Sequence, residues 1–229
     1  MQLLSAKVLI VVTSHAVLGT TGQSTGYYLS EVTHPWAALK ERGISVEIAS
    51  PKGGKAPLDA KSLKLNDPIN KIFWENPATR AQLENTRSLS EIKPTDYQGI
   101  IFAGGHGTMW DFPDDPNLQR VAEKIYESGG VVAAVCHGPA ALVNLRTKDG
   151  QYLVAGKRVA AFSNAEEEAA GLTKVMPILL ESTLIQRGAT YSKAGLWEKH
   201  VVVDGRLVTG QNPASAARLG EAVAKLLSK

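Results

Sequence analysis

The stretch Val131-Val132-Ala133-Ala134-Val135-Cys136-His137-Gly138-Pro139 joins a short, wholly apolar run to a turn. Five consecutive apolar residues that end in a turn are typical of a strand buried on both faces of a parallel sheet. We expect a helix over residues 139–144, directly after the turn. The pattern therefore predicts a buried strand that runs into a helix, with Cys136 at the junction.

Similar apolar runs alternate with helical patterns along the rest of the chain. We expect further strands at 7–12, 45–49, 99–102, 152–154, 159–161, 201–203 and 207–209. We expect further helices at 31–42, 77–87, 116–128, 177–187 and 213–227. Asp204-Gly205 between the last two strands is the turn sequence of a β-hairpin. Residues 52–72 carry Gly, Pro, Asp and Lys without periodicity, which predicts a loop insertion there.

Alternating strands and helices predict an α/β fold. We expect a mostly parallel central sheet with helices on both faces, of the flavodoxin-like kind, in which ligands bind at the carboxyl ends of the strands. The sequence contains no internal repeat, linker or low-complexity segment. Residues 1–229 are therefore expected to form a single domain.

The composition narrows the class of protein. Of the 229 residues, 44% are hydrophobic and 21% are charged, which is ordinary for a globular domain. A single cysteine rules out an intramolecular disulfide and favours a reducing compartment. The net charge is +3, but no Lys/Arg run exceeds two residues, so we expect no specific nucleic-acid partner. The N-terminal apolar run 8–12 is too short for a secretory signal or a membrane span, so we expect a cytoplasmic protein without a membrane partner.

Cys136 is the first candidate for a catalytic residue. Ala134 and Gly138 flank it at two residues on either side, and both are small, as a nucleophile elbow requires. A helix N-terminus after the cysteine would favour the thiolate, which predicts a thiol pKa below the usual ~8.5. The alternative is an inert buried cysteine, which packs as a small hydrophobic residue.

Glycines and acidic residues supply further candidates. Gly104-Gly105-His106-Gly107 follows a predicted strand, where glycines let backbone N–H groups approach an oxyanion. Glu31 begins a predicted helix, which also has the simpler explanation of a favourable helix dipole. Glu167 lies three residues after Asn164, the spacing of a capping box in which Glu167 would only bind the Asn164 backbone.

Metal and cofactor signals are missing from the sequence. No two of the five histidines have the i, i+4 spacing of a helical metal site, so we expect no metal. The glycine-rich run fails the dinucleotide-binding pattern because Trp110 takes the place of the third glycine. We therefore expect no cofactor.

Four segments in this order resemble the PfpI-type glutamine-amidotransferase-like superfamily. They are residues 30–36 (SEVTHPW), 103–107 (AGGHG), 134–138 (AVCHG) and 210–215 (GQNPAS). The branch that the chain most resembles is the heat-shock-protein-thirty-one-like group of glutathione-independent glyoxalases, which are α/β proteins.

The resemblance implies roles for individual residues. Cys136 matches the nucleophile, His137 the adjacent histidine, and Glu31 the acidic residue that faces the cysteine. Glu167 matches the acidic residue that orients the histidine, with Glu166 and Glu168 as alternatives. Gly105 and the backbone of His137 would form the oxyanion site, and His106 would lie beside it to bind substrate.

The resemblance also implies an activity. It is the conversion of methylglyoxal or a related 2-oxoaldehyde, with water, to lactate through a Cys136 hemithioacetal, in a homodimer without a cofactor. Protein or nucleotide deglycation at the same cysteine, a holding-chaperone role, and a cysteine peptidase or amidase activity remain the alternatives. True glutamine amidotransferases carry a late His-x-Glu pair, and here His200 is followed by Val201 and Val202.

Overall fold

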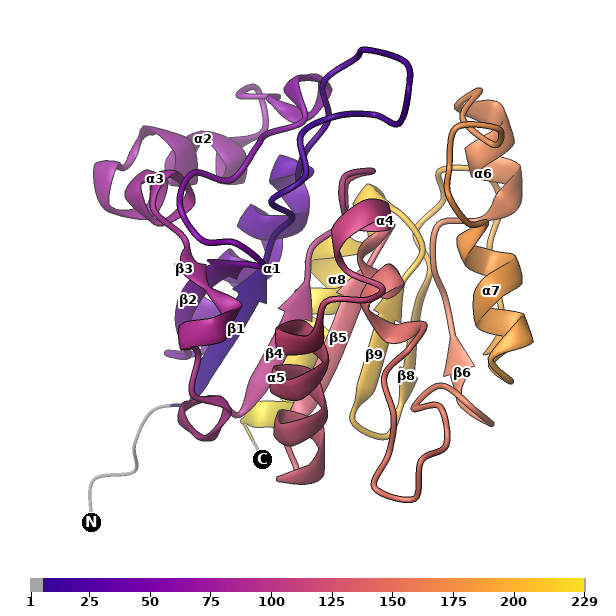
Figure 1. Ribbon diagram of the computed structural model, residues 1–229. Coiled ribbons are helices and arrows are strands. Elements are labelled where there is room, and N and C mark those ends of the chain that lie inside the picture. Colours follow the sequence, from indigo (N-terminus) through magenta and orange to yellow (C-terminus); the bar gives the residue numbers. More distant parts are fainter. Residues whose placement is uncertain (1–5, 229) are drawn as a thin grey trace.

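A computed structural model describes residues 6–228 of the chain (Figure 1). The strands are β1 (Lys7–Val11), β2 (Ser45–Ser50), β3 (Arg87–Ser88), β4 (Gly99–Phe102), β5 (Val131–Val135), β6 (Arg158–Val159), β7 (Thr190–Tyr191), β8 (Val201–Asp204) and β9 (Leu207–Gly210). The α-helices are α1 (Leu29–Glu41), α2 (Pro68–Glu75), α3 (Pro77–Glu84), α4 (Thr108–Asp111), α5 (Pro116–Glu127), α6 (Asn164–Ala169), α7 (Leu180–Gln186) and α8 (Ala216–Leu227).

A central sheet organises the molecule. Its strands follow the order β3-β2-β1-β4-β5-β9-β8, and all neighbours are parallel except the β8–β9 hairpin. The order β2-β1-β4-β5-β9 is the flavodoxin-like arrangement, with the switch point between β1 and β4. A second, two-stranded sheet pairs β6 with β7. The predicted α/β class and the Asp204-Gly205 hairpin are confirmed.

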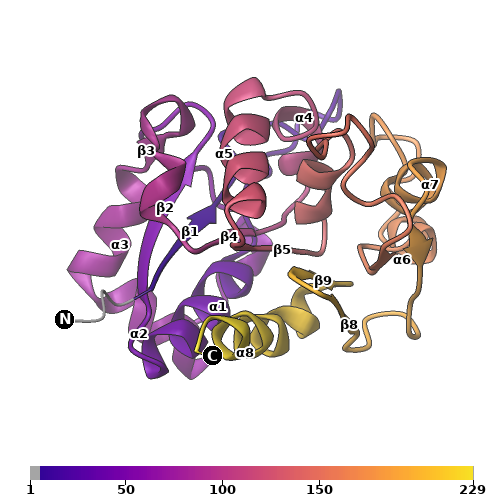
Figure 2. The ribbon, with the colours of Figure 1, turned by 90° about the horizontal axis from the view of Figure 1, so that it is seen from below.

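Helices cover both faces of the sheet. Figure 2 shows α1 and α8 on one face and α5 on the other. Side chains of β5 alternate between two apolar clusters, because successive residues of a strand point to opposite faces. Val132 and Ala134 pack on the α5 side, whereas Val131, Ala133 and Val135 pack on the α1 and α8 side. This double burial explains why β5 is apolar throughout.

Several element ends are shifted, since the helix expected at 77–87 stops at Glu84 and Arg87 begins β3. Three expected elements differ from the structure in kind. Residues 52–72, expected as a loop, contain the 3-10 helix Ala60–Ser62 and the start of α2. The Asp67 side chain accepts hydrogen bonds from Ile69 N and Asn70 N and so caps α2, a local signal that the lack of periodicity concealed. Residues 152–154 are not a strand, because only Tyr152 forms an isolated bridge, with Arg146.

The third difference concerns the turn after Cys136. The α-helix expected at 139–144 is instead the five-residue 3-10 helix Gly138–Leu142. It lies wholly in the core, and such short helices are common as connectors. Among residues 6–228, no helix combines the length and the apolar character needed to cross a membrane.

The nucleophile elbow itself is present. Cys136 has a φ of 60°, the left-handed region that an L-residue rarely adopts. Its N–H donates to Gly210 O at 2.9 Å, and its carbonyl accepts from Phe162 N at 2.8 Å, so two neighbouring segments hold the turn. At Gly138 an added Cβ would lie 2.1 Å from Phe102 O, which explains the small residue there.

The close approach at Gly138 predicts a stability difference between two glycine substitutions. We expect Gly138→Ala to lower the free energy of unfolding by about 1–3 kcal/mol or more, because a backbone atom must shift. Gly99→Ala is the matched control, since its Cβ would make only ordinary contacts of 3.4 Å or longer. Urea unfolding followed by circular dichroism measures both, and equal stabilities would contradict the tight packing of the elbow.

Candidate active site

The candidate residues converge at the carboxyl ends of β4 and β5. Cys136 follows β5, and His106 lies in the glycine-rich turn after β4. Glu31 comes from the first turn of α1, and Glu167 from the first turn of α6. The structure therefore brings together residues from four separate parts of the chain. All are buried except His106, whose side chain is 18% exposed.

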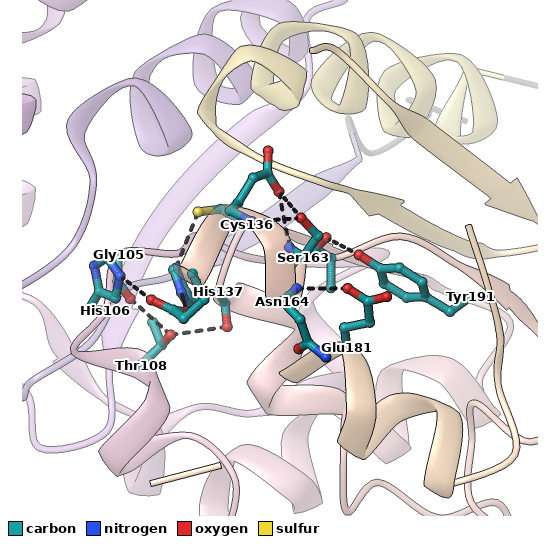
Figure 3. A network of polar contacts seen from close by, with 12 residues as sticks. Gly105, His106, Thr108, Cys136, His137, Ser163, Asn164, Glu181 and Tyr191 are labelled. Atoms are coloured by element: carbon teal, nitrogen blue, oxygen red, sulfur yellow. Dashed lines mark hydrogen bonds and ion pairs between the residues drawn. The ribbon is translucent and has the colours of Figure 1, made fainter. Parts of the chain in front are cut away.

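A hydrogen-bonded relay links the cysteine to Glu167. Cys136 Sγ lies 3.3 Å from His137 Nδ1, and His137 Nε2 lies 2.7 Å from Glu167 Oε2. His106 Nε2 lies 3.0 Å from Glu167 Oε1, so one carboxylate joins two imidazoles. The two rings lie 4.1 Å apart between their centroids. Figure 3 shows the contact between Cys136 and His137, with His106 farther from the sulfur.

The charges in this relay determine where the protons lie. Burial alone would raise the pKa of Glu167, but the His137 and His106 imidazoles outweigh it and lower that pKa to about 2. Burial lowers the pKa of His137, with His106 acting in the same direction. An ionised carboxylate only accepts, so each imidazole donates its Nε2–H to Glu167. Neutral His137 then has its lone pair on Nδ1, where the Cys136 thiol donates.

The cysteine differs from the sequence-based expectation. Burial raises the pKa of the Cys136 thiol well above its ordinary value, and the Glu31 carboxyl raises it further. The His137 backbone N–H opposes this effect but does not outweigh it. The expected lowering relied on the N-terminus of an α-helix, and the five-residue 3-10 helix supplies no comparable dipole. The thiol is therefore protonated at rest and needs a base.

Glu31 is a buried acid next to the cysteine. Its Oε2 accepts a hydrogen bond from Gly104 N at 2.7 Å, while Oε1 has no partner within residues 6–228. Burial raises the pKa of Glu31 to about 8, although the Gly104 N–H and Cys136 lower it in part. A carboxyl group with such a pKa exchanges protons near neutral pH. A simple helix-dipole role would leave an acid exposed, so the burial of Glu31 speaks against that explanation.

The capping box of α6 is shifted by one residue from the expected one. Ser163, not Asn164, is the N-cap, and Glu166 completes the box. The Ser163 N–H and hydroxyl donate to Glu166 Oε2 at 3.0 and 2.9 Å. The shift leaves the neighbouring Glu167 carboxylate available to the two histidines. Glu168 reaches neither and accepts from Thr173 on the surface.

Sequence reasoning missed Thr108. Its hydroxyl hydrogen-bonds Gly105 O at 3.0 Å and His137 O at 3.1 Å, and so joins the two segments expected to form the oxyanion site (Figure 3). Its position directly after Gly107 was the one signal for it in the sequence.

The start of helix α6 is held by a second contact in addition to its capping box. The Asn164 N–H donates a hydrogen bond to Glu181 Oε2 at 2.7 Å.

A cavity of about 310 Å³ opens onto these residues. Gly105, His106, Cys136 and His137 line it, so the expected oxyanion and substrate-binding residues face one space. The rest of the wall is largely apolar and includes Phe162 and Trp197. A small molecule entering the cavity therefore reaches the thiol, both imidazoles and the glycine-rich backbone.

One group among residues 6–228 has the composition of a metal site. His106, His137 and Glu167 place potential ligand atoms within 4.8 Å of one another. The three residues come from separate segments of the chain, so the spacing of histidines within one helix gives no sign of this group. Hydrogen bonds between the imidazoles and the carboxylate already satisfy these atoms.

The model of the DJ-1/PfpI family matches residues 23–226. The chain belongs to this family. It is 35% identical over 227 residues to glyoxalase 3 of Candida albicans, which covers 95% of this chain and 96% of that protein. Among solved structures, glyoxalase III from Candida albicans has a TM-score of 0.89 at 33% identity, covering 96% of this chain and 97% of that one.

A second solved structure with a similar fold is the rapid encystment protein of 24 kDa from Francisella tularensis. It has a TM-score of 0.94 at 41% identity, and the match covers 97% of this chain and 99% of that one. The family match confirms the superfamily resemblance noted from the four sequence segments. The likeness to glutathione-independent glyoxalases is also confirmed, since the chain is 35% identical over 221 residues to glutathione-independent glyoxalase HSP31 of Saccharomyces cerevisiae, covering 92% of this chain and 93% of that protein.

The interaction between Glu31 and Cys136 predicts how alkylation depends on pH. In the wild type, Glu31 ionises near pH 8 and its charge opposes thiolate formation. Glu31→Gln removes that charge, so we expect iodoacetamide to modify this variant up to about tenfold faster near pH 9, one pKa unit corresponding to a factor of ten. Intact-mass measurement gives the rates.

The exposed Glu221 supplies the control for this experiment. Glu221→Gln should alkylate like the wild type at every pH. If Glu31→Gln also follows the wild-type curve from neutral to alkaline pH, the carboxyl does not influence the thiol.

Proposed function

We propose that this protein is a glutathione-independent glyoxalase that converts methylglyoxal and related 2-oxoaldehydes, with water, to 2-hydroxy acids. The observation that carries the proposal is the Cys136–His137–Glu167 relay, whose Cys136 and His137 line the cavity, together with the buried Glu31 next to Cys136. Relatives that match nearly the whole chain and are named glyoxalase support the substrate class.

Addition of the thiol is the first step. The S–H proton of Cys136 passes to His137 Nδ1 at 3.3 Å while the sulfur bonds to the aldehyde carbon. Glu167 stabilises the resulting imidazolium through its contact with Nε2. The Gly105 and His137 N–H groups support the new oxyanion until His137 returns the proton to it, which gives a neutral hemithioacetal.

Proton transfer between the two carbons is the second step. Glu31, as carboxylate, takes the proton from the former aldehyde carbon, which leaves the negative charge on the former ketone oxygen, and the hydroxyl proton of the first carbon then passes to that oxygen. Glu31 then delivers a proton to the adjacent carbon while the first carbon regains its C=O bond as a thioester. One carbon is oxidised and its neighbour reduced, so no external oxidant or reductant is needed.

Hydrolysis of the thioester completes the reaction. A water molecule attacks the thioester carbon, His137 accepts its proton, and the sulfur leaves and recovers a proton. The sum is one 2-oxoaldehyde plus one water to one 2-hydroxy acid. The unpartnered Oε1 of Glu31 and the neutral Nδ1 of His137 are the two proton acceptors that this scheme needs.

The decisive test is a lactate assay on the purified protein with methylglyoxal and no added thiol. We expect lactate from the wild type and a loss of at least ~10³-fold in Cys136→Ala, because the chain has no second cysteine to replace the nucleophile. The melting temperature checks that the variant folds. Lactate formation by Cys136→Ala within tenfold of wild type would refute the covalent route, and a holding chaperone would keep its client binding in this variant.

We also propose that the reaction needs no metal. Dialysis against a strong chelator should leave the rate of lactate formation within about twofold of the untreated enzyme, since each step above uses only side chains and water. Loss of activity that zinc or nickel restores would contradict this. Such a result would mean that His106, His137 and Glu167 bind a metal ion.

A further inference from the structure

The cavity is large for a three-carbon substrate. Its volume of about 310 Å³ falls at the lower end of the range of pockets that take drug-sized ligands, about 300–1,000 Å³. One part of its wall holds Cys136 and His137. The remainder carries the charged residues Asp59 and Lys61 and the apolar residues Leu18, Leu172 and Trp197, and most of the lining area is apolar. The reacting carbonyl groups therefore leave apolar space that a larger substituent can fill.

Thr25 supplies an unexplained polar group in this wall. The residue is 2% exposed, and its Oγ1 has no hydrogen-bond partner within residues 6–228. Its N–H donates to Ala16 O at 2.9 Å, so the backbone is held in place. A buried hydroxyl without a hydrogen-bond partner lowers the stability of the folded protein. Thr25 lines the same cavity as Cys136, so a molecule bound in the cavity is the candidate source of an acceptor for its hydroxyl.

In contrast to the polar Thr25, Trp197 contributes an apolar, aromatic side chain to the wall of the cavity. Its ring lies 5.7 Å from Phe162, whose ring in turn lies 4.2 Å from that of His137. An aromatic series thus runs outward from the reacting residues. Trp197 is 49% exposed, so about half of its surface does not pack against other residues and is accessible to a ligand.

The backbone of Trp197 is held in an unfavourable conformation. Its φ is 63°. Within residues 6–228, Trp197 and Cys136 are the two non-glycine residues that have a positive φ. The Trp197 N–H donates to Glu166 Oε1 at 3.0 Å, which ties it to the capping box of α6. Such strain persists only where the surroundings enforce it, commonly at ligand-binding sites.

The loop that carries Trp197 is anchored at several points. The buried Gln211 accepts from Ala194 N at 2.8 Å and donates to Gly195 O at 3.3 Å. Asn212 Nδ2 donates to Glu198 O at 2.7 Å and to Glu166 Oε1 at 2.9 Å. Trp197 is therefore preorganised as a wall, because the contacts on both sides of it fix its position.

We propose that the site takes 2-oxoaldehydes with a large apolar, preferentially aromatic, substituent. The ketone oxygen accepts a hydrogen bond from Thr25 Oγ1, and the substituent packs against Trp197 and Phe162. This inference rests on the proposed glyoxalase function and extends it to the substrate class. The chemistry is unchanged, so an aryl 2-oxoaldehyde plus water gives an aryl-substituted 2-hydroxy acid.

Kinetics with phenylglyoxal and methylglyoxal separate the two contacts. Trp197→Ala should lower kcat/KM for phenylglyoxal by about tenfold or more while changing it less than about threefold for methylglyoxal, because methylglyoxal has no ring to pack. Thr25→Val should lower kcat/KM for both substrates by about tenfold, and Thr25→Ser should restore it. The melting temperature of Thr25→Val should stay level or rise, since an unsatisfied hydroxyl is removed.

Other outcomes overturn the inference. Equal losses for both substrates in Trp197→Ala would make Trp197 a structural residue only. Unchanged kinetics in Thr25→Val, or a lower melting temperature in that variant, would mean that its hydroxyl serves the fold and not the substrate.

A binding experiment distinguishes this inference from the glyoxalase proposal. Calorimetry with mandelate and lactate, the two product acids, needs no turnover. The inference predicts tighter binding of mandelate to the wild type and to Cys136→Ala, and loss of this preference in Trp197→Ala. Equal binding of both acids by the wild type would refute it, whereas absence of turnover with both aldehydes would refute the glyoxalase function alone.

Discussion

The left-handed backbone at Cys136 is the constraint around which the site is arranged. A φ of 60° ends β5 abruptly and turns the chain into the core. Neighbouring segments come so close to the turn that only glycine fits at two positions beside it. An added Cβ at Gly138 would meet Phe102 O at 2.1 Å, and one at Gly104 would meet His137 N at 2.7 Å. These approaches bring the ends of β4 and β5 together and place the thiol beside the glycine-rich turn.

Two buried carboxyl groups then receive opposite properties from their surroundings. Glu31 is fully buried, and this burial raises its pKa to about 8. Glu167 faces two imidazoles, which lower its pKa to about 2 despite burial. One group can therefore exchange a proton near neutral pH, while the other remains an anion that orients His137. Carboxyl groups divided in this way by environment are a recurring arrangement for acid–base catalysis.

Two adjacent glutamates on α6 have different roles, one in holding the structure and one in the candidate active site. Glu166 accepts hydrogen bonds from Ser163, Trp197 and Asn212, and so joins the helix to the loop that walls the cavity. Glu167 points to the histidines instead. Because successive residues of a helix face in different directions, one turn can be anchored by one carboxylate and present the next to the site. The position of the relay and the position of the Trp197 wall therefore depend on the same helix end.

The sequence by itself determined the α/β class, the buried β5 strand, the elbow at Cys136 and the β8–β9 hairpin, because apolar periodicity and turn residues act locally. It also singled out Glu31 and His137 through the family resemblance. Only the tertiary structure decided the rest. It shifted the capping box from Asn164 to Ser163, replaced the helix after Cys136 by a 3-10 turn, and joined His106 to Glu167. It also raised the pKa of the thiol. These features depend on burial and on contacts between segments far apart in the chain, and neither quantity is encoded in local spacing.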